Sequence, residues 1–194
     1  MNGSTPYRVL ALVGFAAALA AIAPLRAQTA SAGAPETFGA KAQASTKAGA
    51  SVTAPILFHV ERYTPDFDRG VVQEALRVGG YPGFLPALRK APDVGYAELA
   101  SRRVTIRWAR ETVDATGRTI VLITDKPVAF LGGQAEGKSR AGYEVAVIQL
   151  KVDAKGNGTG TMAAAARVKP GGATGVQIDD YAEVPITLAM VARQ

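Results

Sequence analysis

The sequence predicts a mainly β domain, an antiparallel meander that forms a sandwich or a small barrel with one or two short helices at its N-terminal edge. Stretches of the second half of the chain alternate apolar and polar residues with the period of two that half-buried strands require. Short, turn-rich connections join these stretches, which favours antiparallel neighbours. Helical periodicity is confined to the region before Pro92.

The first 27 residues have the layout of a secretory signal peptide. One cation precedes an uncharged run, rich in alanine and leucine, over residues 9–25, and small residues suited to cleavage follow. This run is shorter than the about 20 apolar residues of a membrane span, and Pro24 lies near its end. We therefore expect export to the periplasm or the exterior, with no stable membrane span after cleavage; an uncleaved anchor is the alternative.

Residues 28–54 consist mostly of Ala, Ser, Thr and Gly, with Phe38 as the large apolar exception. A segment of this kind buries too little surface to offset its chain entropy. We therefore expect a flexible linker over residues 28–54 and a single β-rich domain over residues 55–194.

Within this domain, the first strand is expected over Ile56–Tyr63. Asp68 then caps a short helix that ends at Gly79–Gly80, and a second helical piece follows over Phe84–Lys90. Six further strands are expected, over Arg102–Glu111, Arg118–Thr124, Tyr143–Val152, Thr159–Lys169, Val176–Ile178 and Val184–Val191.

The alternation of RVTIRW over residues 103–108 is the firmest strand signal. It places Val104, Ile106 and Trp108 on one face and Arg103, Thr105, Arg107 and Glu111 on the other. The expected core is Val104, Ile106, Trp108, Ile120, Leu122, Val145, Val147, Met162, Val168, Ile186 and Leu188.

Composition removes several classes of site. The chain has no cysteine and one histidine, so disulfides, thiolate metal sites, cysteine nucleophiles and sites with two imidazoles are excluded. Removing Arg8 and Arg26 with the signal peptide lowers the net charge from +6 to about +4, a mild excess that does not call for nucleic acid. We expect no cofactor and no bound metal.

Two segments imitate ligand loops. Residues 132–139 (GGQAEGKS) match the phosphate-loop pattern, but a strand pattern follows where that loop needs a helix, so we expect a glycine-rich hairpin loop. Residues 153–158 have the spacing of a calcium loop, but Lys155 stands where a carboxylate belongs and Ala164 where the closing glutamate belongs, so we expect a hairpin turn.

His59 is the chain's one histidine, within an expected strand, and no GxSxG elbow accompanies it. We therefore expect a surface or hydrogen-bonded histidine instead of a catalytic base.

Acids and cations supply the remaining candidates. Asp179, Asp180 and Glu183 are the candidate catalytic carboxylates, although neighbouring strand residues point to opposite faces unless the backbone turns there. Cations gather between Arg89 and Arg110, and Arg103 and Arg107, which share a strand face, are the candidate binding residues of a basic surface for anionic envelope polymers or lipid headgroups. Scattered, solvated charges are the alternative.

The segments GRTIVLITDKP, RAGYEVAVIQLKVDAKGNGTGTMAAAARVKPGG and IDDYAEVPI, between Gly117 and Pro185, resemble a group of uncharacterised exported bacterial β-rich proteins. The resemblance implies export and a compact β-rich domain, and it implies no activity and no site residue.

Two functions are consistent with the sequence. The first is an exported non-catalytic domain that binds a partner protein, polymer or small ligand in the bacterial envelope or outside the cell. The alternative is a carboxylate-dependent hydrolase or lyase that acts on saccharide or other envelope material. The first is preferred because the sequence has no nucleophile elbow, no metal cluster and no cofactor fingerprint in an acceptable context.

Overall fold

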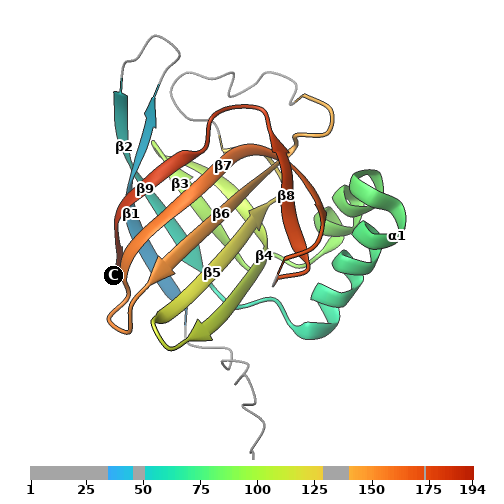
Figure 1. Cartoon of the computed structure of the whole chain (residues 1–194), viewed down its shortest axis with the longest axis horizontal. Coiled ribbons are helices and arrows are strands. Elements are labelled where there is room, and N and C mark those ends of the chain that lie inside the picture. Colours follow the sequence, from blue (N-terminus) through green and yellow to red (C-terminus); the bar gives the residue numbers. More distant parts are fainter. Residues whose placement is uncertain (1–34, 46–50, 129–139, 173) are drawn as a thin grey trace, which may run out of the picture.

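The computed structural model describes residues 35–45, 51–128, 140–172 and 174–194. This part of the chain forms a closed antiparallel barrel of eight strands, with a ninth strand and one kinked helix outside it (Figure 1). The mainly β prediction is confirmed, and of the two architectures expected the barrel is the one observed. The expected signal peptide lies outside the described residues.

One helix, α1, spans Asp66–Lys90. In the described residues, two strands precede α1 in the sequence and seven follow it: β1 Glu36–Ser45, β2 Ser51–Val60, β3 Gly95–Leu99, β4 Arg102–Asp114, β5 Gly117–Thr124, β6 Val145–Val152, β7 Asn157–Pro170, β8 Val176–Tyr181 and β9 Ile186–Arg193.

The barrel closes through two pairings between strands that are not consecutive in the sequence. The strands pair in the order β6, β5, β4, β3, β2, β1, β9, β7, and β6 pairs in turn with β7. The long β7 pairs with β9 over Asn157–Met162, with β6 over Gly158–Ala166, and with β8 over its last residues, Ala166–Pro170. Strand β8 therefore extends the sheet outside the barrel.

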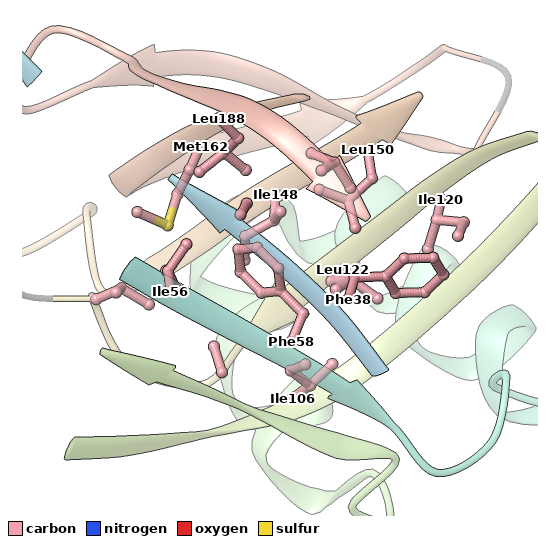
Figure 2. Packing of buried hydrophobic residues seen from close by; sticks show 14 of the residues in the cluster. Phe38, Ile56, Phe58, Ile106, Ile120, Leu122, Ile148, Leu150, Met162 and Leu188 are labelled. Atoms are coloured by element: carbon pink, nitrogen blue, oxygen red, sulfur yellow. The ribbon is translucent and has the colours of Figure 1, made fainter. Parts of the chain in front are cut away.

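Apolar side chains fill the barrel interior. Figure 2 shows them lying between the strands, and the labelled members are Phe38, Ile56, Phe58, Ile106, Ile120, Leu122, Ile148, Leu150, Met162 and Leu188. Each of these is almost completely buried. The strands therefore enclose a packed core and not a channel.

A second apolar cluster lies between α1 and the outer face of β4 to β7. From the helix it includes Val72, Leu76, Phe84 and Leu88, and from the strands Trp108, Val121, Ile123, Val145, Val147 and Ala163. The helix bends at Gly80, whose φ of 59° a residue with a side chain rarely adopts. The two expected helical pieces are thus the halves of one kinked helix, which covers one side of the barrel.

The expected core residues are all buried except Val104, which is half-buried. The prediction that Ile106 and Trp108 lie on the same face of their strand was wrong. The register between β4 and β5 shifts between these two residues, so Arg107 is an extra residue in the ladder. The bulge leaves Ile106 inside the barrel and places Trp108 outside it, against α1.

The linker prediction over residues 28–54 was wrong for β1 and for the start of β2. Strand β1 pairs with β2 along its whole length and with β9 on its other side. Phe38, Ala40 and Ala42 point into the barrel, where small side chains leave room for Phe58. Pairing on both edges supplies the stabilisation that the composition of this segment lacks. The domain therefore includes the segment from Glu36 onward and does not begin at Pro55.

Candidate functional site

A β-bulge brings the carboxylates of Asp179 and Asp180 together. Arg167 of β7 pairs with Asp180, whereas the next residue, Val168, pairs with Ile178, so Asp179 is an extra residue in β8. Arg167 contacts both acids, with Nε 3.0 Å from an Asp179 oxygen and Nη2 3.9 Å from an Asp180 oxygen. The backbone irregularity that a shared site needs is therefore present.

Both acids are held in their ionised form. Lys169 and Arg167 lower the pKa of Asp179, and a hydrogen bond from the Tyr143 hydroxyl lowers the pKa of Asp180. Both lie on an exposed strand surface. A general acid needs a raised pKa, so this pair does not have the electrostatics of an acid–base dyad.

Glu183, the third candidate, is exposed after the end of β8. Within the described residues it forms no side-chain hydrogen bond and no ion pair, so the structure does not bring it into the Arg167 cluster.

Arg107 is not available for a ligand. Its guanidinium donates to the carbonyl oxygen of Ala91 at 2.9 Å, to Asp125 at 3.3 Å, and also to Asp93. Its side chain is 22% exposed. The two carboxylates neutralise the Arg107 guanidinium, and the carbonyl oxygen helps to fix its orientation. Arg107 therefore connects the end of α1 to β4 and β5.

Arg103, in contrast, presents donors to solvent. Its side chain is 63% exposed, and its Nε donates to Glu98 at 2.5 Å. The guanidinium carbon lies 4.3 Å from the centre of the Tyr96 ring. The ion pair and the stacking fix the guanidinium plane, and neither terminal nitrogen donates to another described side chain or backbone group.

His59 extends this arrangement along the outer face of β1, β2 and β3. Its ring lies 5.1 Å from the Tyr96 ring, and its Nδ1 is 2.9 Å from the Thr37 hydroxyl. Thr37, His59 and Tyr96 lie in register on neighbouring strands. Imidazole, phenol and guanidinium thus form one continuous group, which we call the Tyr96 platform: Thr37, His59, Tyr96, Glu98 and Arg103. Of the two alternatives expected for His59, a surface or a hydrogen-bonded histidine, the structure shows the hydrogen-bonded one, half-buried on the outer face.

A buried charged network, which sequence analysis did not identify, lies at one end of the barrel. Arg118 donates to Glu36 at 3.0 and 3.1 Å and to Glu111 at 2.7 Å. The carboxylate side chains are only 8% and 6% exposed. Burial alone would lower the pKa of Arg118, but hydrogen bonds to both carboxylates raise it above its usual range.

Tyr63 lies beside this network. Its hydroxyl is buried without a hydrogen-bond partner among the described residues. Burial raises the pKa of this phenol above its usual range, and the Glu36 and Glu111 carboxylates raise it further. The Glu36 and Glu111 carboxylates are buried and both bind Arg118, so they are not available as an acid–base pair for glycoside hydrolysis.

One signal for this network was present in the sequence. Arg118 has the same strand parity as Ile120 and Leu122, so alternation alone places it inside. Glu111 had been assigned to the opposite face from the core, and the bulge at Arg107 reverses that assignment.

The two loop motifs have different outcomes. Residues 132–139, which match the phosphate-loop pattern, lie outside the described residues. Asp153 lies in a hairpin turn between β6 and β7, where its carboxylate accepts from the backbone of Lys155 and Asn157 at 2.8 and 2.9 Å. In the described part of the chain, no three His, Asp or Glu residues are grouped so that they could hold a metal ion.

A small hollow of about 250 Å³ lies where the β4–β5 and β6–β7 turns meet. Its acidic members, Asp114 and Asp153, both accept hydrogen bonds from the backbone of their own turns. These acids stabilise turns, which leaves Lys151 as the hollow's exposed charge.

The chain matches no family model, no curated protein and no solved structure. None of the helical segments in the described ranges has both the length and the apolar character needed to cross a membrane.

Proposed function

We propose that this protein is an exported, non-catalytic domain of the bacterial envelope or exterior, and that it binds a partner carrying carboxylates, such as an acidic polymer, on the Tyr96 platform. The observation that carries the proposal is the orientation of Arg103. Glu98 and Tyr96 hold its guanidinium in place while most of its side chain remains exposed to solvent. A guanidinium fixed in this way binds a carboxylate by two parallel hydrogen bonds at a low entropy cost.

The surroundings of Arg103 support an extended ligand. The platform lies on the outer face of β1, β2, β3 and the start of β4, whereas α1 packs against β4 from Trp108 onward and against β5 to β7. Lys41, an exposed residue on the same outer face of β1, adds a second cation along the sheet. A ligand that crosses the strands from Arg103 on β4 to Lys41 on β1 needs anionic groups at intervals, as acidic polymers have.

The filled interior also favours surface binding. Barrels that carry a ligand inside leave a cavity among their inward side chains. Here Phe38, Phe58 and Met162 occupy that position. The enzymatic alternative has less support, because Asp179 and Asp180 are both ionised and exposed.

Binding to polygalacturonate, a polymer of carboxylated sugars, tests the proposal. We expect saturable binding by calorimetry, weakened at least tenfold in Arg103→Gln, and no binding to neutral dextran. Arg167→Gln is the matched control. Arg167 lies on β7, is also paired with an acid, and has its guanidinium carbon 5.5 Å from the centre of the Tyr143 ring. Equal losses in the two variants would indicate a general charge effect and contradict the assignment to the platform.

Export has its own test. Mass spectrometry of the protein from its native host should find an N-terminus between Gln28 and Gly33. An intact Met1 in a cytoplasmic fraction would contradict export without affecting the binding proposal.

A further inference from the structure

The fold places the chain's one histidine, His59, in the Tyr96 platform. Its neighbours on β2, Phe58 and Val60, are buried inside the barrel, so the half-buried imidazole lies on the outer face of the sheet. Histidine is the side chain that ordinarily changes charge between about pH 5 and pH 8. Because the chain has no cysteine, His59 is its one side chain of a type that ordinarily titrates near neutral pH.

The hydrogen bond to Thr37 suits both charge states of the imidazole. Nδ1 of His59 and the Thr37 hydroxyl oxygen are 2.9 Å apart. A hydroxyl both donates and accepts, so it can donate to Nδ1 of the neutral ring or accept from Nδ1–H of the protonated ring. Protonation therefore costs no hydrogen bond at Nδ1. In the described ranges, Nε2 bonds no side chain or backbone group, and its N–H is a donor for a ligand.

The imidazole lies close to the guanidinium of Arg103. Both contact the Tyr96 ring: the imidazole centre is 5.1 Å from the centre of that ring, and the guanidinium carbon is 4.3 Å from it. The two groups are therefore less than about 10 Å apart, a separation close to the Debye length in about 0.1 M salt. A positive charge on His59 thus attracts an anionic chain that is bound to Arg103.

We propose that His59 is a second ligand-binding residue of the Tyr96 platform, and that its protonated ring donates from Nε2 to a carboxylate next to the one that Arg103 binds. This inference rests on the proposed function and makes it more specific. The ligand carries closely spaced carboxylates, and the platform binds it more tightly in mildly acidic surroundings than in neutral ones. The reason is that a hydrogen bond from a charged imidazole to a carboxylate is stronger than one from a neutral ring.

The other charged and titratable groups around His59 do not account for such a change. Carboxylates ordinarily titrate near pH 4, and phenols, amines and guanidiniums at about pH 10 or above, so groups of these types keep their charge between about pH 5.5 and pH 8. The ligand's carboxylates stay ionised for the same reason. The groups on this face are Lys41 on β1, Glu61 after β2, Tyr96 and Glu98 on β3, Arg103 on β4, and the main-chain carboxylate of Gln194 beside Thr37.

Calorimetric titration with polygalacturonate at about pH 5.5 and pH 8, at constant ionic strength, tests the proposal. We expect the wild type to bind at least about threefold more tightly at the lower pH. His59→Gln is uncharged at both pH values and should bind weakly at both, whereas His59→Lys is charged at both and should bind tightly at both. Arg167→Gln, the control on β7, should keep the pH dependence of the wild type. Circular dichroism checks that each variant is folded.

The coupling between protonation and binding is reciprocal. Saturating polygalacturonate should therefore shift the protonation of the single imidazole, followed by its NMR signals, to higher pH. An imidazole titration that is the same with and without the polymer would contradict the contact.

The outcomes separate this inference from the proposed function. Binding that requires Arg103 but is equally tight at both pH values would reject the role of His59 and leave the proposed function standing. A pH dependence that persists in His59→Gln would belong to another group, such as the terminal amine, and would also overturn the inference. Absence of binding at both pH values would reject the proposed function and this inference with it.

Discussion

Arg118 and Glu36 join opposite sides of the barrel at one of its ends. They are 82 residues apart in the sequence and are connected by hydrogen bonds of 3.0 and 3.1 Å. Arg118 lies at the start of β5 and Glu36 at the start of β1, and in the closed order of strands these two are equally far apart in either direction. The pair therefore spans the barrel and anchors the first residue of its first strand.

Replacing Arg118 by methionine tests this connection. Arg118→Met leaves the two buried carboxylates of Glu36 and Glu111 without a partner, which should lower the free energy of unfolding by about 3 to 5 kcal/mol. Urea denaturation measures the loss. Arg103→Met breaks an exposed ion pair with Glu98, so it should lower the free energy of unfolding much less than Arg118→Met does. Similar losses in the two variants would contradict a buried role for Arg118.

Two neighbouring hydroxyls should respond differently to removal. The Tyr63 hydroxyl is buried and unpartnered among the described residues, so Tyr63→Phe should leave stability within about 0.5 kcal/mol or increase it. Thr64 is 3% exposed, and its hydroxyl accepts a hydrogen bond from the backbone N–H of Ala109 at 2.9 Å. Thr64→Val should therefore cost about 1 to 3 kcal/mol in thermal or urea unfolding. The reverse order would show that the Tyr63 hydroxyl has a partner.

Replacement by alanine should have opposite effects on stability at Gly95 and at Gly70. Gly95 has a φ of 152° where β3 approaches β2, and a methyl group on it would overlap the carbonyl oxygen of His59. Gly95→Ala should cost about 3 kcal/mol or more. Gly70 lies within α1 with open space around it, so Gly70→Ala should stabilise the protein by about 0.5 to 1 kcal/mol. Melting temperatures that fall in both variants would contradict the open position of Gly70.

The ion pairs of β8 predict a pH dependence. The pKa values of Asp179 and Asp180 are lowered in the folded protein, so folding favours their ionised forms. Their contribution is present above the ordinary aspartate pKa of about 4 and is lost as the pH falls through the lower folded values. The melting temperature of Asp179→Asn/Asp180→Asn should lie below that of the wild type at pH 7, and the two should converge between about pH 4 and pH 2. Glu183→Gln should follow the wild type throughout, and a gap that widens in acid would refute the sign of these shifts.

Local patterns sufficed to predict most strands and the helical region, because alternation and turn residues act over a few neighbouring residues. The strands from Arg102 onward appear close to their predicted bounds. The segment of β1 gave no such signal, because its inward residues after Phe38 are alanines. Its stabilisation comes from β2 and β9, and the latter is at the far end of the chain.

The candidate binding site was predictable in part. Arg103 was identified from its exposed strand face, but its fixed orientation depends on Tyr96 and Glu98 of β3, a strand that was not predicted. Arg107 lies on the same predicted strand face as Arg103, but its guanidinium is bound by Asp93 and Asp125. Sequence parity shows that a cation faces outward, whereas only the packed structure shows which carboxylates reach it.

By itself, the sequence determined that this chain alternates between two periodicities, that its turns are short, and that cysteine and paired histidines have no part in its chemistry. Only the tertiary structure decided that the sheet closes, that Trp108 packs outside the barrel and that Glu111 reaches Arg118 inside it. The reason is physical. The face of each residue follows from its place in a strand, but one extra residue at Arg107 reverses every face after it, and the energy that selects this bulge comes from contacts between distant segments.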